Sequence, residues 1–435
     1  MVLKKNICLF RLTVFVLLIS IFLVPCLYGQ TSADGIDDHI FKIAVIGPSD
    51  EVFIWWGHAA LFVEHTRWKT SWTYDWGIFT YPSESFVKDF IKGQVQYSVE
   101  SSSPDIQNYI KEDRDIIVYT LDLDKKAKEI MLSYAKNKVL PENRNYDYHE
   151  FLDNCSTGVR DILDLGLRGQ FKAAFDNVPG RLTFRQHVKR FIWFRLFPEW
   201  LLDFLMGQDL DRQITPWEEM FLPVEIGRNI VDFKYIDEFG KERKLVSSVE
   251  IINSSKTRQP ILNEPLDTKI FFFIAGLIIM AFVFFIRTLR KRYFRFYRIL
   301  WGIIQSILGL FFGSAGCILF WGLFLMNNDY IQQNINIFFV NPLLLIIVPL
   351  GILTAINKSF RINPDRILRL LWTYVFAAGS VTEILKVLPF FYQQNQNVSG
   401  FVLPIAFAFS IIPENIYKLK PLFRKLRKRF SRGRR

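Results

Sequence analysis

The second half of this 435-residue chain contains five long apolar stretches, and these constrain the fold more than any other feature. The first is IFFFIAGLIIMAFVFFI at 270–286, and the others occupy residues 299–326, 336–356, 367–391 and 399–415. Each stretch approaches the ~20 apolar residues that a helix needs to cross a bilayer. A buried core helix explains one such stretch, but not five in succession. The sequence therefore predicts an all-α membrane region of five transmembrane helices at 267–416.

Lys and Arg are distributed unequally between the predicted loops, and this distribution indicates the orientation of the helices. Cytoplasmic loops of membrane proteins collect basic residues. The segments on one side, 287–298, 358–369 and 418–435, contain six, four and ten basic residues, or 20 in total. The loops on the other side, NNDYIQQN and YQQNQNVSG, contain none. We therefore expect a multi-pass protein of a bacterial inner membrane, with a periplasmic N-terminal domain and a cytoplasmic tail at 417–435.

The same basic segments account for the formal net charge of +12. Basic runs beside a membrane span contact anionic lipid headgroups more often than nucleic acid. Membrane lipid is therefore an expected partner, and nucleic acid is not. The sequence contains neither a phosphate-binding glycine loop nor a metal-ligand spacing, so no cofactor and no metal are expected. The oligomeric state is not indicated.

The first 30 residues have the order of a secretory signal. Lys4 and Lys5 precede an apolar run that extends from Ile7 to Leu27, and small residues follow near Gly29. We interpret residues 1–29 as a cleaved signal peptide. A retained membrane anchor is the alternative.

One cysteine of the four lies outside the apolar segments, in NYDYHEFLDNCSTGVRDILDLG at 145–166. In an oxidising compartment such an unpaired thiol is either buried and inert or kept for its reactivity. Apolar residues at helical spacing follow Cys155, and Asp153 or Asn154 can cap that helix. The first turn of a helix favours the thiolate, which is the nucleophilic form. Cys155 is therefore a candidate nucleophile.

A cysteine nucleophile needs a base, and His58 is the strongest candidate among the five histidines. It lies in the apolar strand pattern VFIWWGHAALFVEH, whereas the other four, His39, His65, His149 and His187, are expected on the surface. The next strand pattern, SWTYDWGIFTY, contains one carboxylate, Asp75. An acid on an adjacent strand can orient a catalytic imidazole. The alternative is that His58 is a core residue hydrogen-bonded to the backbone.

Four motifs occur together in the N-terminal half: WGHAAL at 56–61, YDWGIF at 74–79, PENRNYDYHEFLDNCSTGVRDIL at 141–163 and EEMFLP at 218–223. Together they resemble the Lnb N-terminal periplasmic domain family, over roughly residues 38–230. The resemblance implies an envelope domain and supplies no activity.

The order of His58 and Cys155 is also similar to that of circularly permuted papain-like enzymes, which include NlpC-type peptidases and lecithin retinol acyltransferase relatives. This second resemblance implies that Cys155 is the nucleophile, His58 the general base and Asp75 the orienting group. It also implies that the backbone N–H of Cys155 contributes to an oxyanion hole. Supporting roles are expected for three further residues, Asn154, Arg144 and Tyr148.

The predicted organisation has an α+β papain-like domain at 30–230, a hairpin and juxtamembrane linker at 231–266, and the five helices. The aromatic segment RFIWFRLFPEWLLDFLMG at 190–207 is expected to lie against the membrane or over the active-site cleft, with an amphipathic core helix as the alternative.

The favoured function is thiol-dependent hydrolysis or acyl transfer at an amide or ester of a cell-envelope substrate. One alternative is a non-catalytic binding or assembly module. Another is that the membrane helices are the working part, because Glu383 and Lys386 lie one turn apart within a span and intramembrane charges are often functional.

Overall fold

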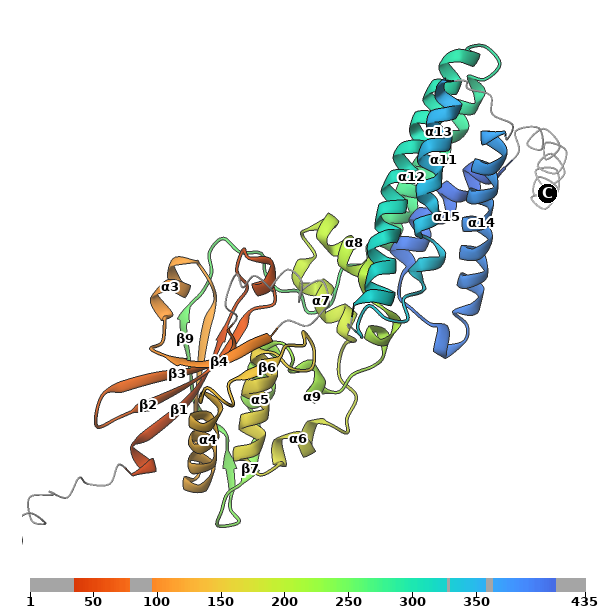
Figure 1. Cartoon of the computed structure of the whole chain (residues 1–435). Helices are drawn as coiled ribbons and strands as arrows, with labels where there is room; N and C mark the ends of the chain where they lie inside the picture. The colour runs from red at the N-terminus through yellow and green to blue at the C-terminus, as the bar shows by residue number, and fades with distance from the viewer. Residues whose placement is uncertain (1–34, 79–95, 327–328, 357–362, 412–435) are drawn as a thin grey trace, which may run out of the picture.

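The computed structural model describes residues 35–78, 96–326, 329–356 and 363–411. The predicted signal peptide and basic tail lie outside these residues. Figure 1 shows an α+β domain at one end of the molecule and a bundle of long helices at the other. This arrangement confirms the α+β class of the N-terminal domain and the helical character of the C-terminal region.

The N-terminal domain is built on a seven-stranded sheet with the order β6-β4-β3-β2-β1-β5-β9, and every neighbouring pair is antiparallel. The strands are β1 (His39–Ile46), β2 (His58–His65), β3 (Thr70–Ile78), β4 (Gln96–Ser102), β5 (Ile116–Leu121), β6 (Asn145–Asp147) and β9 (Val246–Asn253). The apolar runs of the first two strands explain why they lie near the centre, since a central strand is covered on both faces.

Alternate residues of β2 face two different hydrophobic cores. Ala59, Leu61 and Val63 pack with α4 (Lys125–Lys138) and α5 (Cys155–Gly166) on one face. Ala60 and Phe62 lie in the second core, against α3 (Ile106–Lys111) on the other face. The period of two along a strand therefore places neighbouring residues in opposite layers.

The segment after residue 230 contributes to this domain as well as leading to the membrane. The strands β7 (Lys234–Ile236) and β8 (Glu242–Lys244) pair as a hairpin, whose turn uses Gly240 at φ +79°. β9 then pairs with β5 at the edge of the large sheet. Part of the predicted hairpin and linker segment is thus an edge strand of the N-terminal domain.

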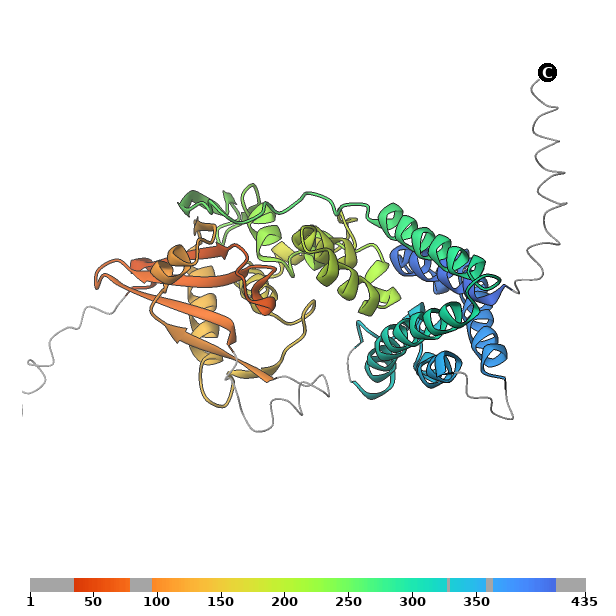
Figure 2. The ribbon, with the colours of Figure 1, turned by 90° about the horizontal axis from the view of Figure 1, so that it is seen from above.

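Several short helices connect the sheet domain to the bundle. They are α6 (Gln170–Phe175), α7 (Phe184–Ile192), α8 (Leu196–Leu205), η3 (Gln208–Asp211), α9 (Pro216–Glu219) and α10 (Pro223–Ile230). Figures 1 and 2 place α7 and α8 between the sheet and the long helices. Trp200 of α8 stacks on Phe272 and Phe311, and Phe204 is buried in the core of the bundle. The aromatic segment at 190–207 therefore docks on the membrane helices.

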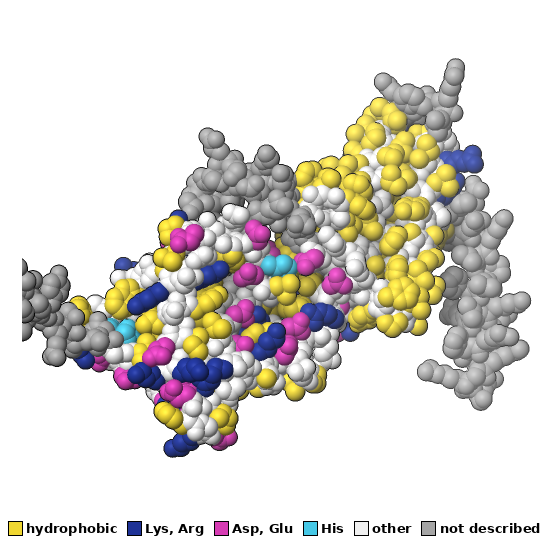
Figure 3. All heavy atoms as spheres, turned by 60° about the horizontal axis from the view of Figure 1, so that its bottom comes forward, with side chains coloured by type: hydrophobic (Ala, Val, Ile, Leu, Met, Phe, Trp, Pro, Cys, Tyr) yellow, Lys and Arg dark blue, Asp and Glu magenta, His cyan; other side chains and the backbone are white. Residues whose placement is uncertain are grey.

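Four helical segments of the described chain are long and apolar enough to cross a membrane. They are α11 (Lys269–Thr288), α12 (Phe294–Leu325), the segment Ile335–Ile356 and α14 (Pro364–Leu385). The third segment is interrupted, since it consists of η4 (Ile335–Phe338), η5 (Pro342–Ile346) and α13 (Ile347–Ile356). Figure 3 shows the mostly hydrophobic surface of this bundle beside the mixed, charged surface of the N-terminal domain. The protein is therefore a membrane protein.

The prediction of five spanning helices is wrong in number. The fifth apolar stretch forms α15 (Gln396–Ser410), and the 15 described residues of this helix extend only about 22 Å, less than the ~30 Å of a bilayer core. Its apolar side chains Val398, Val402 and Ile405 are completely buried in the bundle. A helix that is covered by protein is as apolar as one that faces lipid. Composition alone therefore overestimated the number of spans.

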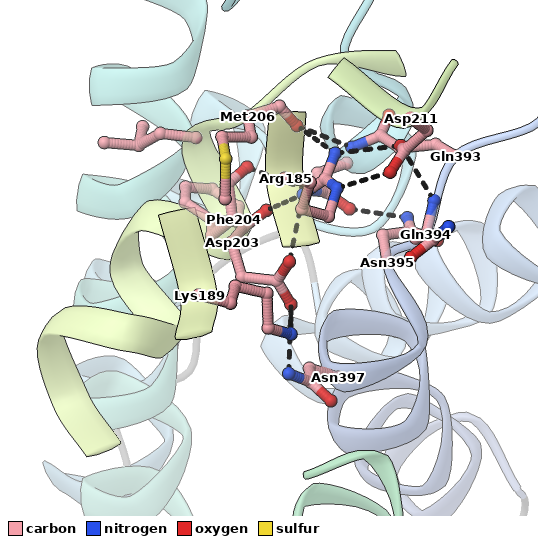
Figure 4. Close-up of polar contacts among 12 residues, drawn as sticks. Arg185, Lys189, Asp203, Phe204, Met206, Asp211, Gln393, Gln394, Asn395 and Asn397 are labelled. Carbon is pink, nitrogen blue, oxygen red and sulfur yellow. Dashed lines mark hydrogen bonds and ion pairs between the residues drawn. The ribbon is translucent and has the colours of Figure 1, made fainter. Parts of the chain in front are cut away.

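A buried polar network fixes the N-terminal domain to the membrane region (Figure 4). The guanidinium of Arg185 on α7 donates to Asp203 and Asp211 at 2.9 and 2.7 Å, and all three side chains are 1% exposed. The side chains of Asn334 and Gln393, from loops of the membrane region, donate to the carbonyl of Met206 at 3.2 and 2.9 Å. Buried polar groups of this kind are stable only when their partners are in place, so the network couples the two parts.

Candidate active site at the start of α5

Cys155 is the first residue of α5, and the residue before it forms the cap. The side-chain oxygen of Asn154 accepts from the N–H groups of Ser156 and Thr157 at 2.8 and 3.0 Å. The hydroxyl of Thr157 accepts in turn from the N–H of Asn154 at 2.7 Å, which completes a capping box. Asn154, rather than Asp153, is therefore the cap that sets where α5 begins. The N–H of Cys155 remains one of the free donors of the first turn.

The start of α5 is also fixed from outside by the segment that contains EEMFLP. The amide of Asn154 donates to the carbonyl of Phe221 at 3.1 Å, and the hydroxyl of Ser156 donates to the carbonyl of Met220 at 2.8 Å. One turn further on, Arg160 lies over the ring of Trp217 at 4.2 Å. Two motifs about 60 residues apart in the chain thus form one contact, which no local pattern in either motif predicts.

Glycines let the helix approach β3 closely. A Cβ on Gly158 would lie 2.5 Å from the indole of Trp76, so no larger residue fits there without movement. Gly77 has φ +87° and lies beside an irregularity in the pairing of β3 with β4. A Cβ built on Gly77 would lie 3.5 Å from the Cβ of Cys155. Cys155 therefore packs directly against the end of β3.

The imidazole of His58 is hydrogen-bonded to Asp75 across neighbouring strands. Nε2 of His58, the first residue of β2, lies 2.7 Å from Oδ1 of Asp75 on β3. The two side chains are 17% and 12% exposed, so the pair lies at the surface edge of the sheet rather than deep inside it. Gly57, at φ +87°, directs the chain into β2, because a Cβ there would lie 2.6 Å from the carbonyl oxygen of Ile46.

The charges around His58 favour its protonated form. Burial lowers the pKa of the imidazole, but the negative charges of Asp75 and of the Cys155 thiolate, together with hydrogen bonds to both groups, raise it well above its ordinary value. Since Asp75 uses Nε2, the other ring nitrogen, Nδ1, is the one available to the thiol. The structure brings His58, Asp75 and Cys155 into one interacting group.

Three tyrosines form the wall of the site beside Cys155. Tyr97 and Tyr148 stack with their ring centres 4.0 Å apart. Burial, with the charges of Glu150 and Cys155, raises the pKa of Tyr97 to about 12, and burial next to Cys155 raises the pKa of Tyr148 and of Tyr146 as well. The buried hydroxyl of Tyr146 lies 4.0 Å from the position of a Cβ on Gly77. These phenols are neutral hydrogen-bond donors at neutral pH.

The sequence-based candidates differ in how they relate to this site. Tyr148 belongs to its wall and Asn154 caps its helix. Arg144 is exposed, and it is the carbonyl of Arg144 that makes a contact here, accepting from the N–H of Val99 at 2.9 Å. Tyr97 and Tyr146 were not identified from the sequence. The aromatic residues of NYDYH were the available signal for Tyr146, whereas Tyr97 comes from a distant strand.

The expectation that the other histidines lie on the surface is wrong for three of the four. His39, His65 and His187 are 8%, 5% and 0% exposed. His39 and His65 lie opposite each other on β1 and β2, with ring centres 4.7 Å apart. Charged neighbours in the sequence do not reveal burial in a strand, because alternate residues face opposite sides. His149 lies at the junction, with Nε2 2.8 Å from Oδ1 of Asp329.

Metal ligands and intramembrane charges are the other groups that could form a functional site. Across the described ranges, no group of three or more His, Cys, Asp and Glu side chains could hold a metal ion. In the membrane region, Nζ of Lys386 lies 2.6 Å from Oε1 of Glu383, so this intramembrane pair is formed. It lies on a different part of the molecule from Cys155 and contributes nothing to the arrangement of His58.

The N-terminal domain is similar to one known protein family. Residues 41–190 match the family model described as the Lnb N-terminal periplasmic domain, and this segment includes His58, Asp75 and Cys155. No curated protein and no solved structure matches the chain. With the apolar helices that follow, the match indicates a membrane-anchored envelope protein. Over residues 41–190, the chain is similar to the Lnb N-terminal periplasmic domain family.

Proposed function

We propose that this membrane-anchored protein uses Cys155 as a nucleophile in hydrolysis or acyl transfer at an amide or ester of a cell-envelope substrate. The observation that carries the proposal is the hydrogen bond of 2.7 Å between Asp75 and Nε2 of His58. The Cys155 thiolate raises the pKa of the same imidazole, so the three side chains interact. A papain-like relationship is part of the proposal. An α-helix that begins at the cysteine and packs on an antiparallel sheet supports it.

In the first step, His58 accepts the proton of the Cys155 thiol at Nδ1, and the thiolate attacks the substrate carbonyl. Asp75 holds the ring in the required orientation and stabilises the imidazolium. The negative oxygen of the tetrahedral intermediate is stabilised by the N–H of Cys155, with the hydroxyl of Tyr146 as a second donor. The helix dipole of α5 favours negative charge at the same place.

In the second step, the intermediate collapses to a thioester on Cys155 as the imidazolium gives its proton to the leaving amine or alcohol. Water, or the amine or alcohol of an acceptor, then attacks the thioester while His58 removes its proton. Release of the acyl product returns the thiol. Hydrolysis and transfer differ only in the acceptor, and the site holds the groups for both.

The competing function is a non-catalytic binding module. The observation that favours it is that Cys155 is partly buried and packs against the main core of the domain, as an inert cysteine does. Reactivity distinguishes the two, because a packing thiol reacts slowly and independently of His58.

The test uses the full chain with Cys317→Ser, since Cys317 is also free and is exposed. Iodoacetamide is added at pH ~6.5, and alkylation of Cys155 is followed by peptide mass mapping. An ordinary thiol with a pKa of ~8.5 is only about 1% thiolate at that pH. We therefore expect His58→Ala to slow the reaction by about tenfold or more. Cys155→Ser abolishes labelling at this position.

The control is His65→Ala. His65 is the last residue of β2, at the opposite end of the strand from His58, where its Nδ1 accepts from the N–H of Trp68 at 3.2 Å. Its loss is expected to leave the alkylation rate unchanged. Slow labelling of Cys155 that does not depend on His58 contradicts the catalytic proposal and favours the binding module.

We also propose an inner-membrane location with the C-terminus in the cytoplasm. The support is the distribution of basic residues, 20 in the segments at one end of the bundle and none in the opposite loops. Although α15 is too short to count as a fifth span, it starts beside Lys269 at the junction and runs parallel to α11. Its carbonyl at Phe409 accepts from Arg287 at 3.4 Å, so the chain leaves the bundle at the end away from the N-terminal domain. This orientation places the N-terminal domain in the periplasm, as the family name describes it.

A further inference from the structure

Two cavities follow the same pair of helices, α11 and α15. The first, of about 350 Å³, lies where the N-terminal domain meets the membrane region. Charged and amide side chains line much of it, among them Lys189, Asp203, Glu264, Asp267, Lys269 and Asn397. The second, a groove of about 290 Å³, lies beside α11, α14 and α15 and is lined mainly by apolar side chains. We call them the polar cavity and the apolar groove.

The spacing of the lining residues places the polar cavity above the groove. On α11, Lys269 lines the polar cavity, while Phe273, Leu277 and Met280 line the groove. These positions lie at i, i+4, i+8 and i+11, which is one face of a helix.

The same relation holds on α15. Gln396 lines the polar cavity, and Gly400, Leu403 and Phe407 line the groove at i+4, i+7 and i+11. Both helices therefore present one continuous face that begins with polar residues and continues with apolar ones.

The walls are held by close backbone contacts. A Cβ on Gly276 would lie 2.7 Å from the carbonyl oxygen of Phe401, so α11 and α15 touch where they cross. At the polar end, the amide of Asn397 donates to Asp203 at 3.0 Å (Figure 4). It also donates to the hydroxyl of Thr268 at 2.9 Å. These contacts hold the helices that form the walls of both cavities.

The polar cavity and the groove together match the depth of one leaflet. From Phe273 to Met280, which line the groove, α11 rises about 11 Å. From Lys269 in the polar cavity to Met280 it rises about 16 Å, which is close to half of the ~30 Å hydrocarbon thickness of a bilayer. Phe407 and Phe273 are 38% and 47% exposed at the groove, so its side is open toward the surrounding lipid. An acyl chain can enter from the bilayer without crossing the protein.

The polar cavity contains fixed charges of both signs. Three carboxylates, Asp203, Glu264 and Asp267, line it with two ammonium groups, Lys189 and Lys269. Lys189 contacts Asp203 at 3.3 Å inside the junction, whereas the pair of Lys269 with Asp267 is more than half exposed. A ligand with one anionic and one cationic group can separate the exposed pair and form an ion pair with each member, Lys269 and Asp267. A purely anionic ligand can pair only with Lys269 and leaves Asp267 without a partner.

We propose that the polar cavity and the apolar groove together bind one zwitterionic diacyl phospholipid. Its phosphate pairs with Lys269, its ammonium group pairs with Asp267 and Glu264, and one acyl chain lies in the groove. None of the lining residues belongs to the site of Cys155, so the proposal is independent of the function proposed for that site. Such a lipid would fill the space beside the junction through which the N-terminal domain is held.

The test measures lipid retained by the full chain. Delipidated protein in detergent is mixed with equal amounts of dioleoyl phosphatidylethanolamine and dioleoyl phosphatidylglycerol, and bound lipid is counted by native mass spectrometry. We expect one phosphatidylethanolamine per chain, retained about tenfold more tightly than phosphatidylglycerol, which corresponds to about 1.4 kcal/mol. Equal retention of the two lipids, or no retained lipid, overturns the proposal.

The groove is tested with Leu277→Trp, which fills it. The matched control is Ile278→Trp, because Ile278 is the adjacent residue, is 63% exposed and does not line the groove. We expect Leu277→Trp to reduce retention by about tenfold and Ile278→Trp to leave it unchanged. Equal retention by the two variants contradicts the proposal.

Thermal unfolding in detergent distinguishes a variant that does not fold from one that folds but no longer binds the lipid. A folded Leu277→Trp variant unfolds at the temperature of the wild type without lipid but is not stabilised when phosphatidylethanolamine is added. If Leu277→Trp does not fold, Met280→Trp fills the groove one turn deeper and is judged in the same way.

The headgroup is tested with Lys269→Gln and with Lys244→Gln as the control. Both side chains are 56% exposed and paired with an aspartate, but only Lys269 lines the polar cavity. Lys269→Gln is expected to weaken retention of phosphatidylethanolamine about fivefold. An equal effect of the two changes contradicts the role of Lys269.

Discussion

Oδ1 of Asp75 lies 2.7 Å from Nε2 of His58, although 17 residues separate the two in the chain. The bond joins neighbouring strands at the edge where α5 begins, and it leaves Nδ1 of the imidazole for Cys155. In the proposed mechanism the carboxylate acts on the thiol through the ring. The first prediction therefore concerns Asp75 as a positioning residue.

Asp75→Asn is expected to shift the pH profile of Cys155 alkylation upward by about one to two pH units. A hydrogen bond to a charged group contributes about 1.5–3 kcal/mol, and one pH unit corresponds to about 1.4 kcal/mol. Without the carboxylate the imidazolium is less stable, and so is its ion pair with the thiolate. The profile is measured with iodoacetamide on the full chain with Cys317→Ser. Asp147→Asn, on exposed β6, is the control and is expected to leave the profile unchanged.

The same pair makes the fold sensitive to pH in a defined direction. The pKa of His58 is raised in the folded state, so its stabilisation is complete below the unfolded value of ~6.5 and is lost as pH rises through the folded value. The unfolding temperature is therefore expected to fall across that range in the wild type and to change less in Asp75→Asn. A steeper decrease in the variant contradicts the assignment.

Gly77→Ala is expected to reduce the reactivity of Cys155. At φ +87° an alanine costs about 1–2 kcal/mol in backbone strain, and its methyl group would lie 3.5 Å from the Cβ of Cys155. Gly240→Ala is the control, because Gly240 has φ +79° and nothing lies within 4 Å of its added Cβ. Both variants lose stability in thermal unfolding, but only Gly77→Ala slows alkylation. Equal alkylation rates would mean that the end of β3 does not position the thiol.

Arg185→Met is expected to destabilise the full chain by about 3–5 kcal/mol, because it leaves two buried carboxylates without their partner. Those carboxylates belong to Asp203 and Asp211, which are 1% exposed. Arg212→Met removes the partner of Glu218 instead, and it is expected to cost at most about 1 kcal/mol because Arg212 is half exposed. Thermal unfolding of the purified protein in detergent measures both. Equal losses would mean that the junction network adds little to stability.

The proposed orientation predicts the behaviour of reporters fused after Arg435. A fluorescent protein that matures in the cytoplasm is expected to be active there, and alkaline phosphatase, which needs an oxidising compartment, is expected to be inactive. The loop on the opposite side is a poor place for a reporter, because Asn334 is buried and bonded to the carbonyls of α8. The reverse pattern of activities would place Cys155 in the cytoplasm.

Local patterns in the sequence were sufficient to predict several features of the structure. The start of a helix at Cys155 follows from the apolar spacing after it and from a cap within two residues, and Asn154 forms that cap. The α+β class follows from the alternating pattern of the strands and the spacing of apolar residues in the helices, and the membrane region follows from the length of its apolar stretches. These features depend on hydrogen bonds and side-chain periods within one element, so the residues that determine them are neighbours in the chain.

Contacts between distant elements were decided only by the tertiary structure. The sequence did not indicate that Tyr97 and Tyr146 lie beside Cys155, that β9 completes the sheet, or that Phe204 enters the core of the bundle. Composition also overestimated the number of spans, because burial by protein and burial by lipid select the same apolar residues. The local sequence determines which side of each helix or strand is apolar or charged. Which of these surfaces come into contact depends on the packing of all the elements together, and the residues that determine this packing are distributed over the whole chain.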